Sequence, residues 1–218
     1  MVVRVDRQFL FDTVGETLFQ GSLTGEQVEG IAALLHAWER WPWRDDDRWL
    51  AYMLATVFHE TAHTMQPVRE TLATEDDKAI EILESAFANG RLSWVRTPYW
   101  RKDEEGKSWL GRGLVQLTHK RNYKAMSAVT GIDLVADPDR AMEMDTAVTI
   151  LMEGMRLGSF TGYKLADFFG DDRQDWVNAR RIVNGTDRAE QIAGYGLTLH
   201  SAIRYAENAR PGGPRRVG

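Results

Sequence analysis

The 218-residue chain contains no cysteine, which excludes disulfide bonds and thiolate metal ligands. It also lacks any apolar run close to the roughly 20 residues that span a bilayer, so we expect no membrane insertion. The net charge of −5 provides no basic surface of the kind that binds nucleic acid. Residues 1–6 lack the basic-then-apolar layout of a secretory signal. A chain that acts outside the cytoplasm would therefore need another exit route.

Length and composition predict a single catalytic domain over residues 1–208. Domains usually hold roughly 100–200 residues, and the 43% hydrophobic content is enough for a buried core. We expect helices within residues 1–44 to pack on this domain. Residues 209–218 are rich in proline, glycine and arginine, which predicts a disordered tail.

Hydrophobic spacing predicts a mainly α-helical fold. Thr24 and Gln27 have the pattern of a capping box at the start of the second predicted helix. Residues 91–113 contain aromatics and glycines without a helical period, which predicts a long loop with room for one short β-hairpin. Apolar residues recur at helical intervals over 6–19, 24–40, 45–64, 80–89, 118–129, 139–156, 165–169, 173–183 and 187–207.

One interpretation of the segment HETAH at 59–63 is a zinc peptidase site. His-Glu-x-x-His places two imidazoles one turn apart on a helix, with the glutamate beside a metal-bound water. The third ligand would then come from Glu81 or Glu84, because no histidine follows at metzincin spacing. A purely structural interpretation also stays open, in which Glu60 caps the helix or forms an ion pair near its end.

A further interpretation makes Glu60 the acid of a glycoside hydrolase. Glu60 shares a helical face with Met53 and Val57, and this apolar setting is expected to raise its pKa so that it holds a proton near neutral pH. Such an enzyme needs a second carboxylate across the scissile bond. Glu70 is the first candidate, because Pro67 turns the chain back toward the same cleft. The other candidates are Glu75, Glu81 and Glu84.

Residues 111–123 read GRGLVQLTHKRNY and lead into a predicted helix. The two glycines allow a tight backbone path near a ligand. Gln116 and Thr118 alternate with apolar residues, so their side chains are expected to point the same way. Alternatively, Thr118 is a helix N-cap. Asn122 and Tyr123 could likewise be ordinary surface and core residues. A zinc peptidase does not require this segment.

Residues 180–186 read RRIVNGT. The Asn184-Gly185 pair is an ordinary helix end, while the amide of Asn184 also suits an N-acetyl group or a sugar hydroxyl. Arg180 or Arg181 is expected to hold a catalytic carboxylate through charged hydrogen bonds.

In this order, HET at 59–61, GRGLVQLTHKRNY at 111–123 and VNG at 183–185 resemble glycoside hydrolase family 19, which includes plant-type chitinases and phage endolysins. The resemblance covers about residues 45–200. It implies a lysozyme-like, mainly helical two-lobed fold with a central cleft. It also implies an inverting mechanism without a metal or another cofactor.

The resemblance assigns roles to individual residues. Plant-type members have glycines where this chain has Ala62 and His63, and their second carboxylate falls at Glu81 or Glu84. The ten-residue gap from Glu60 to Glu70 instead looks like the endolysin branch. The roles implied are general acid for Glu60, substrate binding and water positioning for Gln116 and Thr118, and cleft lining for Asn122, Tyr123 and Asn184.

The expected reaction is cleavage of the β-1,4 glycan backbone of peptidoglycan, with chitin as the alternative substrate. Glu60 would protonate the glycosidic oxygen and Glu70 would activate a water that Thr118 orients, while Trp100 or Trp109 would stack on the sugar. A non-catalytic wall-binding module is a further alternative. We expect a monomer without nucleic-acid partners, held in the host bacterial cytoplasm until holin-type membrane release.

Overall fold

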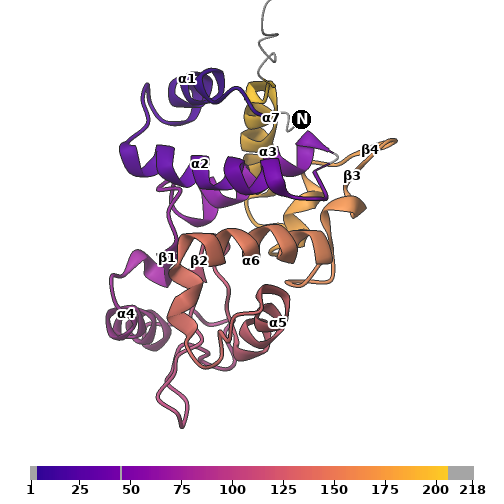
Figure 1. Cartoon of the computed structure of the whole chain (residues 1–218). Helices are drawn as coiled ribbons and strands as arrows, with labels where there is room; N and C mark the ends of the chain where they lie inside the picture. The colour runs from indigo at the N-terminus through magenta and orange to yellow at the C-terminus, as the bar shows by residue number, and fades with distance from the viewer. Residues whose placement is uncertain (1–3, 45, 206–218) are drawn as a thin grey trace, which may run out of the picture.

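The computed structural model describes residues 4–44 and 46–205, and Figure 1 shows how their elements are arranged. This part of the chain is mainly α-helical, as the sequence predicted, with two short antiparallel strand pairs. The α-helices are α1 (Arg7–Leu18), α2 (Gly25–Arg40), α3 (Asp47–Glu60), α4 (Asp76–Ala88), α5 (Lys120–Thr130), α6 (Met144–Leu157) and α7 (Ala189–Ala202). The strands are β1 (Val68–Arg69), β2 (Arg112–Gly113), β3 (Phe169–Gly170) and β4 (Arg173–Gln174), and the 3-10 segments are η1 (Glu70–Leu72), η2 (Pro138–Met142), η3 (Leu165–Asp167) and η4 (Asn178–Ile182).

Helix α3 runs through the centre of the larger hydrophobic core. All residues from 50 to 58 are buried, as expected of a helix that is apolar around its whole circumference. Helix α7 packs along it. Leu10 of α1 and Leu34 of α2 are buried in the same core, so the N-terminal helices are part of the body that supports Glu60.

A second, smaller core lies under α4 and the loop that follows it. Its buried members are Ala79, Leu83, Trp100 and Leu110. Figure 1 shows α4 and the long loop after it at the opposite end of the molecule from α1, α2 and α7. The chain therefore forms a larger body and a smaller lobe, and β1 and β2 lie between them.

Local signals predicted several helix ends correctly. Thr24 and Gln27 form the expected capping box, and α4 ends at Asn89 with Gly90 at a positive φ of 72°. Other boundaries were wrong. The helix predicted over 173–183 is strand β4 followed by the 3-10 segment η4, because residues 169–170 and 173–174 pair as a hairpin. The helix predicted over 139–156 is interrupted at Glu143, which is extended.

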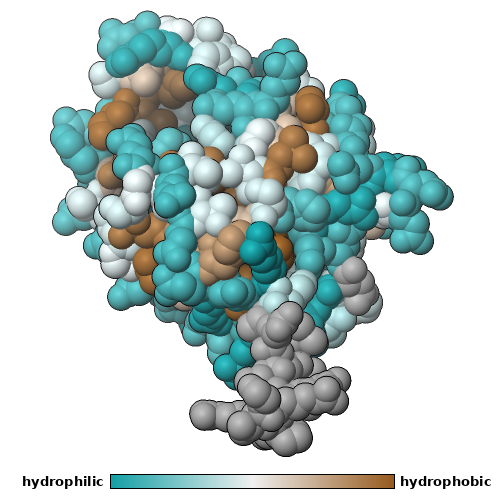
Figure 2. All heavy atoms as spheres, turned by 90° about the horizontal axis from the view of Figure 1, so that it is seen from above, coloured by the Kyte–Doolittle hydropathy of each residue, from teal (hydrophilic) through white to brown (hydrophobic). Residues whose placement is uncertain are grey.

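The predicted hairpin within residues 91–113 does not form inside that loop. Strand β2 at its end pairs with β1 instead, matching Val68 with Gly113 and Arg69 with Arg112. The predicted tail, 209–218, lies outside the described residues. Among the described helices, none has the length and apolarity to cross a membrane. Figure 2 shows a mostly hydrophilic face on which hydrophobic residues form small, separate groups.

Candidate functional site

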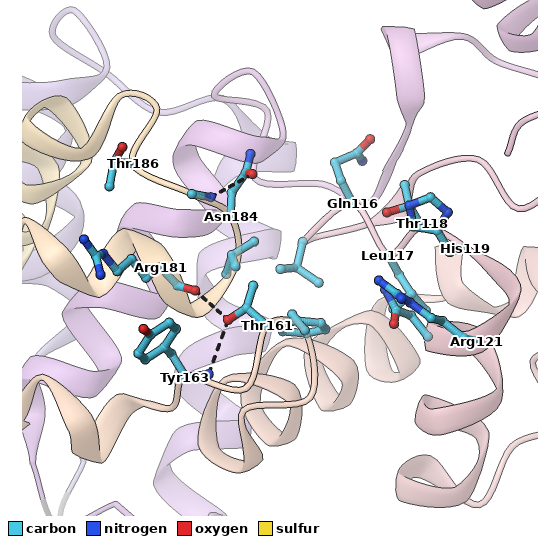
Figure 3. A pocket seen from close by; sticks show the side chains of 15 residues that line it. Gln116, Leu117, Thr118, His119, Arg121, Thr161, Tyr163, Arg181, Asn184 and Thr186 are labelled. Carbon is cyan, nitrogen blue, oxygen red and sulfur yellow. Dashed lines mark hydrogen bonds between the residues drawn. The ribbon is translucent and has the colours of Figure 1, made fainter. Parts of the chain in front are cut away.

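A pocket of about 580 Å³ lies between two segments that are distant in sequence. One wall comes from residues 115–122, and the other from residues 160–163 and 181–186. Figure 3 shows Gln116, Thr118 and His119 on one side, facing Asn184 and Thr186 on the other. The fold thus brings the GRG–VQLT segment and the VNG segment to a common cavity.

The first wall is built on a tight turn. The backbone groups of Arg112 and Leu117 exchange two hydrogen bonds of 3.2 and 2.9 Å, and Gln116 has a positive φ of 53°. A Cβ atom placed on Gly111 would lie 2.7 Å from Oε1 of Gln116 and 3.3 Å from Cγ2 of Thr118. Both side chains therefore lie over Gly111. They share a side as predicted, but through a turn and not through an extended strand.

Glu70 is hydrogen-bonded to Gly111, next to the turn that forms this wall. Its carboxylate accepts hydrogen bonds from the Tyr99 hydroxyl at 2.7 Å and from the Gly111 amide at 2.8 Å. Its own amide donates to the Gly111 carbonyl at 2.7 Å. Desolvation by burial raises the pKa of Tyr99, and the Glu70 carboxylate raises it further. The hydroxyl therefore stays protonated and remains a donor to Glu70.

The other carboxylates considered as the base have different surroundings. Glu75 and Glu81 are exposed on α4 or just before it, and Glu81 pairs with Lys78. Glu84 accepts hydrogen bonds from Trp100 and from Arg101. Of the four candidates, only Glu70 is hydrogen-bonded to Gly111, over which the lining residues Gln116 and Thr118 lie.

Four charged residues fix the strand pair that carries Glu70 and Gly111. Arg69 pairs with Asp76 and Asp139 at 2.9 Å each, and Arg112 pairs with Asp139 at 3.0 Å and with Asp76. The Arg112 side chain is only 1% exposed. This closed quartet connects β1 and β2 to α4 on one side and to η2 on the other.

Glu60 is attached to the opposite wall. Arg180 donates a hydrogen bond of 2.5 Å to Oε1 of Glu60 and one of 3.1 Å to the Asp187 carbonyl. The side chains of Arg180 and Glu60 are 4% and 15% exposed. The prediction that Arg180 or Arg181 holds a carboxylate is confirmed for Arg180. Glu60 is not among the residues that line the pocket. Its connection to that wall is through Arg180, which precedes the lining residue Arg181 in the sequence.

The geometry that the zinc interpretation requires is absent. Helix α3 ends at Glu60, with Thr61 as its C-cap, and His63 has a positive φ of 71°. His63 stacks on the Phe58 ring at 4.0 Å and is not one helical turn beyond His59. Within residues 4–44 and 46–205, no three carboxylate or imidazole side chains are grouped to hold a metal. The helical His-Glu-x-x-His arrangement that the zinc alternative requires is therefore not formed.

Three aromatic residues predicted to contact sugar are core residues instead. Tyr123 is fully buried, and its hydroxyl bonds to Arg112 and to the Leu110 carbonyl. Trp109 is 6% exposed and donates to Asp103, and Trp100 is 0% exposed. Their placement as sugar-binding residues was wrong, because Trp100 is buried in the smaller core and Trp109 and Tyr123 are buried in the larger one.

The remaining predicted residues have mixed outcomes. Thr118, Gln116, Asn122 and Asn184 all line the pocket. Thr118 is not a helix cap, since α5 begins at Lys120 after His119. The Asn184 side chain accepts a hydrogen bond from the Gly185 amide at 2.9 Å, which leaves its NH₂ group available to a ligand.

Sequence reasoning missed the part of the pocket formed by residues 160–163. Thr161 donates hydrogen bonds to the carbonyls of Arg181 and Ile182 at 2.5 and 3.1 Å, which holds this loop against the VNG segment. Tyr163 lines the pocket and is 44% exposed. The signal in the sequence was the pair of glycines, Gly158 and Gly162, which both have a positive φ in the structure.

Backbone strain is concentrated around the same segments. Among the described residues, nine non-glycine residues have a positive φ, and seven of them lie within 62–72 and 116–119. Such conformations cost about 1–3 kcal/mol each and persist where the surrounding structure enforces them, often at functional sites. Their distribution singles out the chain around Glu60, Glu70 and Gln116.

Two half-buried histidines lie beside the carboxylates. The pKa of His119 is lowered by desolvation and by the charge of Arg121, while Glu70 opposes the shift. The pKa of His59 is lowered by desolvation first, and the charges of Glu60 and Arg180 act on it in opposite directions. Both imidazoles are therefore neutral at pH 7 and contribute no positive charge to the site.

Comparisons with protein-family models, with curated proteins and with solved structures each found no match.

Proposed function

We propose that this protein is a glycoside hydrolase that cleaves the β-1,4 glycan backbone of peptidoglycan by an inverting mechanism. The observation that carries the proposal is the pocket between residues 115–122 and 181–186, together with two carboxylates, Glu70 hydrogen-bonded to Gly111 and Glu60 hydrogen-bonded to Arg180, that connect to its two sides. A glycosidase needs two carboxyl groups on opposite sides of a bound sugar. Glu70 is connected to one side of the pocket through Gly111, and Glu60 to the other side through Arg180.

Glu60 acts as the general acid in this proposal. Arg180 engages Oε1, and Oε2 has no hydrogen-bond partner among the described residues. In this role Oε2 would carry the proton for the leaving oxygen, while Arg180 fixes the orientation of the carboxyl group. Arg180 also stabilises the carboxylate that remains after the proton has left.

Glu70 acts as the base. Each of its oxygens accepts one hydrogen bond, from Tyr99 or from the Gly111 amide, and a carboxylate oxygen accepts two. A water molecule therefore has a free lone pair to bind. Gln116 and Thr118 lie over Gly111, beside this carboxylate, where the Thr118 hydroxyl would orient the water for attack.

The polar lining suits N-acetylated sugars. Asn122 and Asn184 offer amide donors and acceptors for hydroxyl and acetamido groups. Gln116 donates its NH₂ group to the carbonyls of Val68 and Gly113 and offers its amide oxygen as an acceptor. The exposed ring of Tyr163 offers an apolar face for a pyranose. Chitin oligomers carry the same acetamido groups and are the second candidate substrate. The proposed setting is a phage or prophage lysis enzyme that reaches the wall after a pore opens in the membrane.

The test measures fragments released from purified peptidoglycan by mass spectrometry, with chitin oligomers in parallel. We expect wild-type protein to release glycan fragments and Glu60→Gln to lose about 100-fold or more of that activity. Glu70→Gln should lose a similar amount, while Glu75→Gln and Glu81→Gln serve as matched controls on exposed carboxylates. Full activity in Glu60→Gln would remove the proposed acid. Full activity in Glu70→Gln would move the base elsewhere.

A further inference from the structure

The pocket has a charge opposite to that of the whole chain. Its lining contains two arginines, Arg121 and Arg181, and no aspartate or glutamate, although the chain carries a net charge of −5. The lining histidine, His119, has a lowered pKa and is neutral at pH 7. The positive charge of the cavity therefore comes from the two guanidinium groups.

The two arginines come from opposite walls. Figure 3 shows Arg121 on the side of Thr118 and His119, and Arg181 on the side of Asn184. Within the described part of the chain, neither side chain forms an ion pair or a hydrogen bond. Nearby Arg180 and Arg112, in contrast, are buried in ion pairs. Arg121 and Arg181 are thus exposed charges that the fold does not use for its own stability.

We propose that the pocket selects glycans that bear carboxylates, which bind to Arg121 on one wall or to Arg181 on the other. This inference rests on the proposed function and narrows its substrate class. Peptidoglycan carries carboxylates on the lactyl group of its muramic acid and on its stem peptide, whereas chitin carries none. The arginines therefore favour peptidoglycan at the substrate-binding step, independently of the residues that cleave the bond.

The expected size of the effect is modest, because both arginines are exposed. An exposed pair of opposite charges contributes up to about 1 kcal/mol, which corresponds to roughly fivefold in affinity for each arginine. The contribution should weaken as salt shortens the range of the charge. Shape and hydrogen bonding to the acetamido groups supply the affinity that remains.

The test is isothermal titration calorimetry with three tetrasaccharides on wild-type protein and on the slow Glu60→Gln variant. The probes are chitotetraose, an alternating N-acetylglucosamine–N-acetylmuramic acid tetrasaccharide without peptide, and the same tetrasaccharide with its stem peptide. We expect a muramic-acid probe to bind about tenfold more tightly than chitotetraose. The variant Arg121→Gln/Arg181→Gln should lose this preference, with unchanged affinity for chitotetraose. Arg91→Gln, an exposed arginine outside the pocket, should behave as wild type.

A gain in affinity with the peptide-free tetrasaccharide would assign the bound carboxylate to the lactyl group. A gain in affinity that requires the peptide would assign it to the stem peptide. Equal affinity for all three probes, or a preference that survives in the double variant, would overturn the inference. Mass spectrometry of the same oligosaccharides separates this outcome from failure of the enzyme itself. Cleavage combined with binding that does not depend on the two arginines would contradict only the carboxylate site. Arginine-dependent binding without any cleavage would contradict only the proposed hydrolase activity.

Discussion

Arg180 binds Glu60 across 120 positions of sequence, through a hydrogen bond of 2.5 Å that is largely shielded from solvent. The pair joins the end of α3 to the loop that forms one wall of the pocket. Because Arg180 also donates to the Asp187 carbonyl, one side chain sets the position of both the carboxyl group and the wall.

Replacing Arg180 should therefore destabilise the protein. Arg180→Met leaves the partly buried Glu60 carboxylate without its partner, and we expect a loss of about 2–4 kcal/mol in the free energy of unfolding. Urea denaturation measures this loss. Arg181→Met is the matched control, because that neighbouring side chain is exposed and its removal should change stability by less than about 0.5 kcal/mol. Equal stability of both variants would show that the pair contributes nothing.

Tyr123 should be important for stability and not for substrate binding. Tyr123→Phe removes the hydroxyl that bonds to Arg112 and to the Leu110 carbonyl, which should cost about 1–3 kcal/mol. Thermal unfolding and KM measured on peptidoglycan fragments separate the two roles. A raised KM with an unchanged Tm would instead indicate that Tyr123 contacts the substrate.

Two glycines of the turn should respond differently to alanine. In Gly111→Ala the new methyl group displaces the Gln116 amide, a flexible side chain end, so we expect lower activity with a stability loss under about 1 kcal/mol. In Gly113→Ala the methyl group meets the Ala141 carbonyl at 2.8 Å, at a φ of 86°, so we expect a loss of about 2 kcal/mol or more. Gly25→Ala, with open space around it, is the control. Activity and urea unfolding of all three variants provide the comparison.

Acid should weaken the fold through His119. Its folded pKa is lowered by burial and by Arg121, below the value of about 6.5 in an unfolded chain. The unfolded chain then binds the proton more readily, so this contribution to stability is complete above about pH 6.5 and declines as pH falls toward the lowered pKa. Arg121→Gln removes a repelling charge and should raise the His119 midpoint in an NMR titration. An unchanged midpoint would contradict the assigned cause, and Arg91→Gln is the control.

Elements with local signals were predictable, because the residues that end them are neighbours in sequence. The capping box of Thr24 and Gln27 is one example. The end of α3 at Glu60 was not, because the loop after it is set by tertiary contacts. Gln27 donates to the His63 carbonyl, and a Cβ on Gly30 would lie 1.9 Å from the Met65 carbonyl oxygen. The chain after Glu60 therefore follows the surface of α2 and not a helical path.

The candidate site was predictable to a similar extent. The sequence placed Gln116, Thr118, Asn122 and Asn184 at a ligand, and all four line one pocket. The ion-pair quartet of Arg69, Arg112, Asp76 and Asp139 had no sequence signal, since its members come from four separate elements. Trp100, Trp109 and Tyr123 were misplaced because a composition rich in aromatics does not distinguish a sugar-binding face from a buried core.

The smaller core has a consequence for how the molecule fluctuates. Ala79, Leu83, Trp100 and Leu110 are its buried members, far fewer than surround α3, so amide hydrogens of α4 should exchange with heavy water at a lower opening free energy. Tyr99, which packs on that core and donates to Glu70, belongs to the less protected half. The two carboxylates of the site are thus anchored in parts of the protein that open with different frequencies.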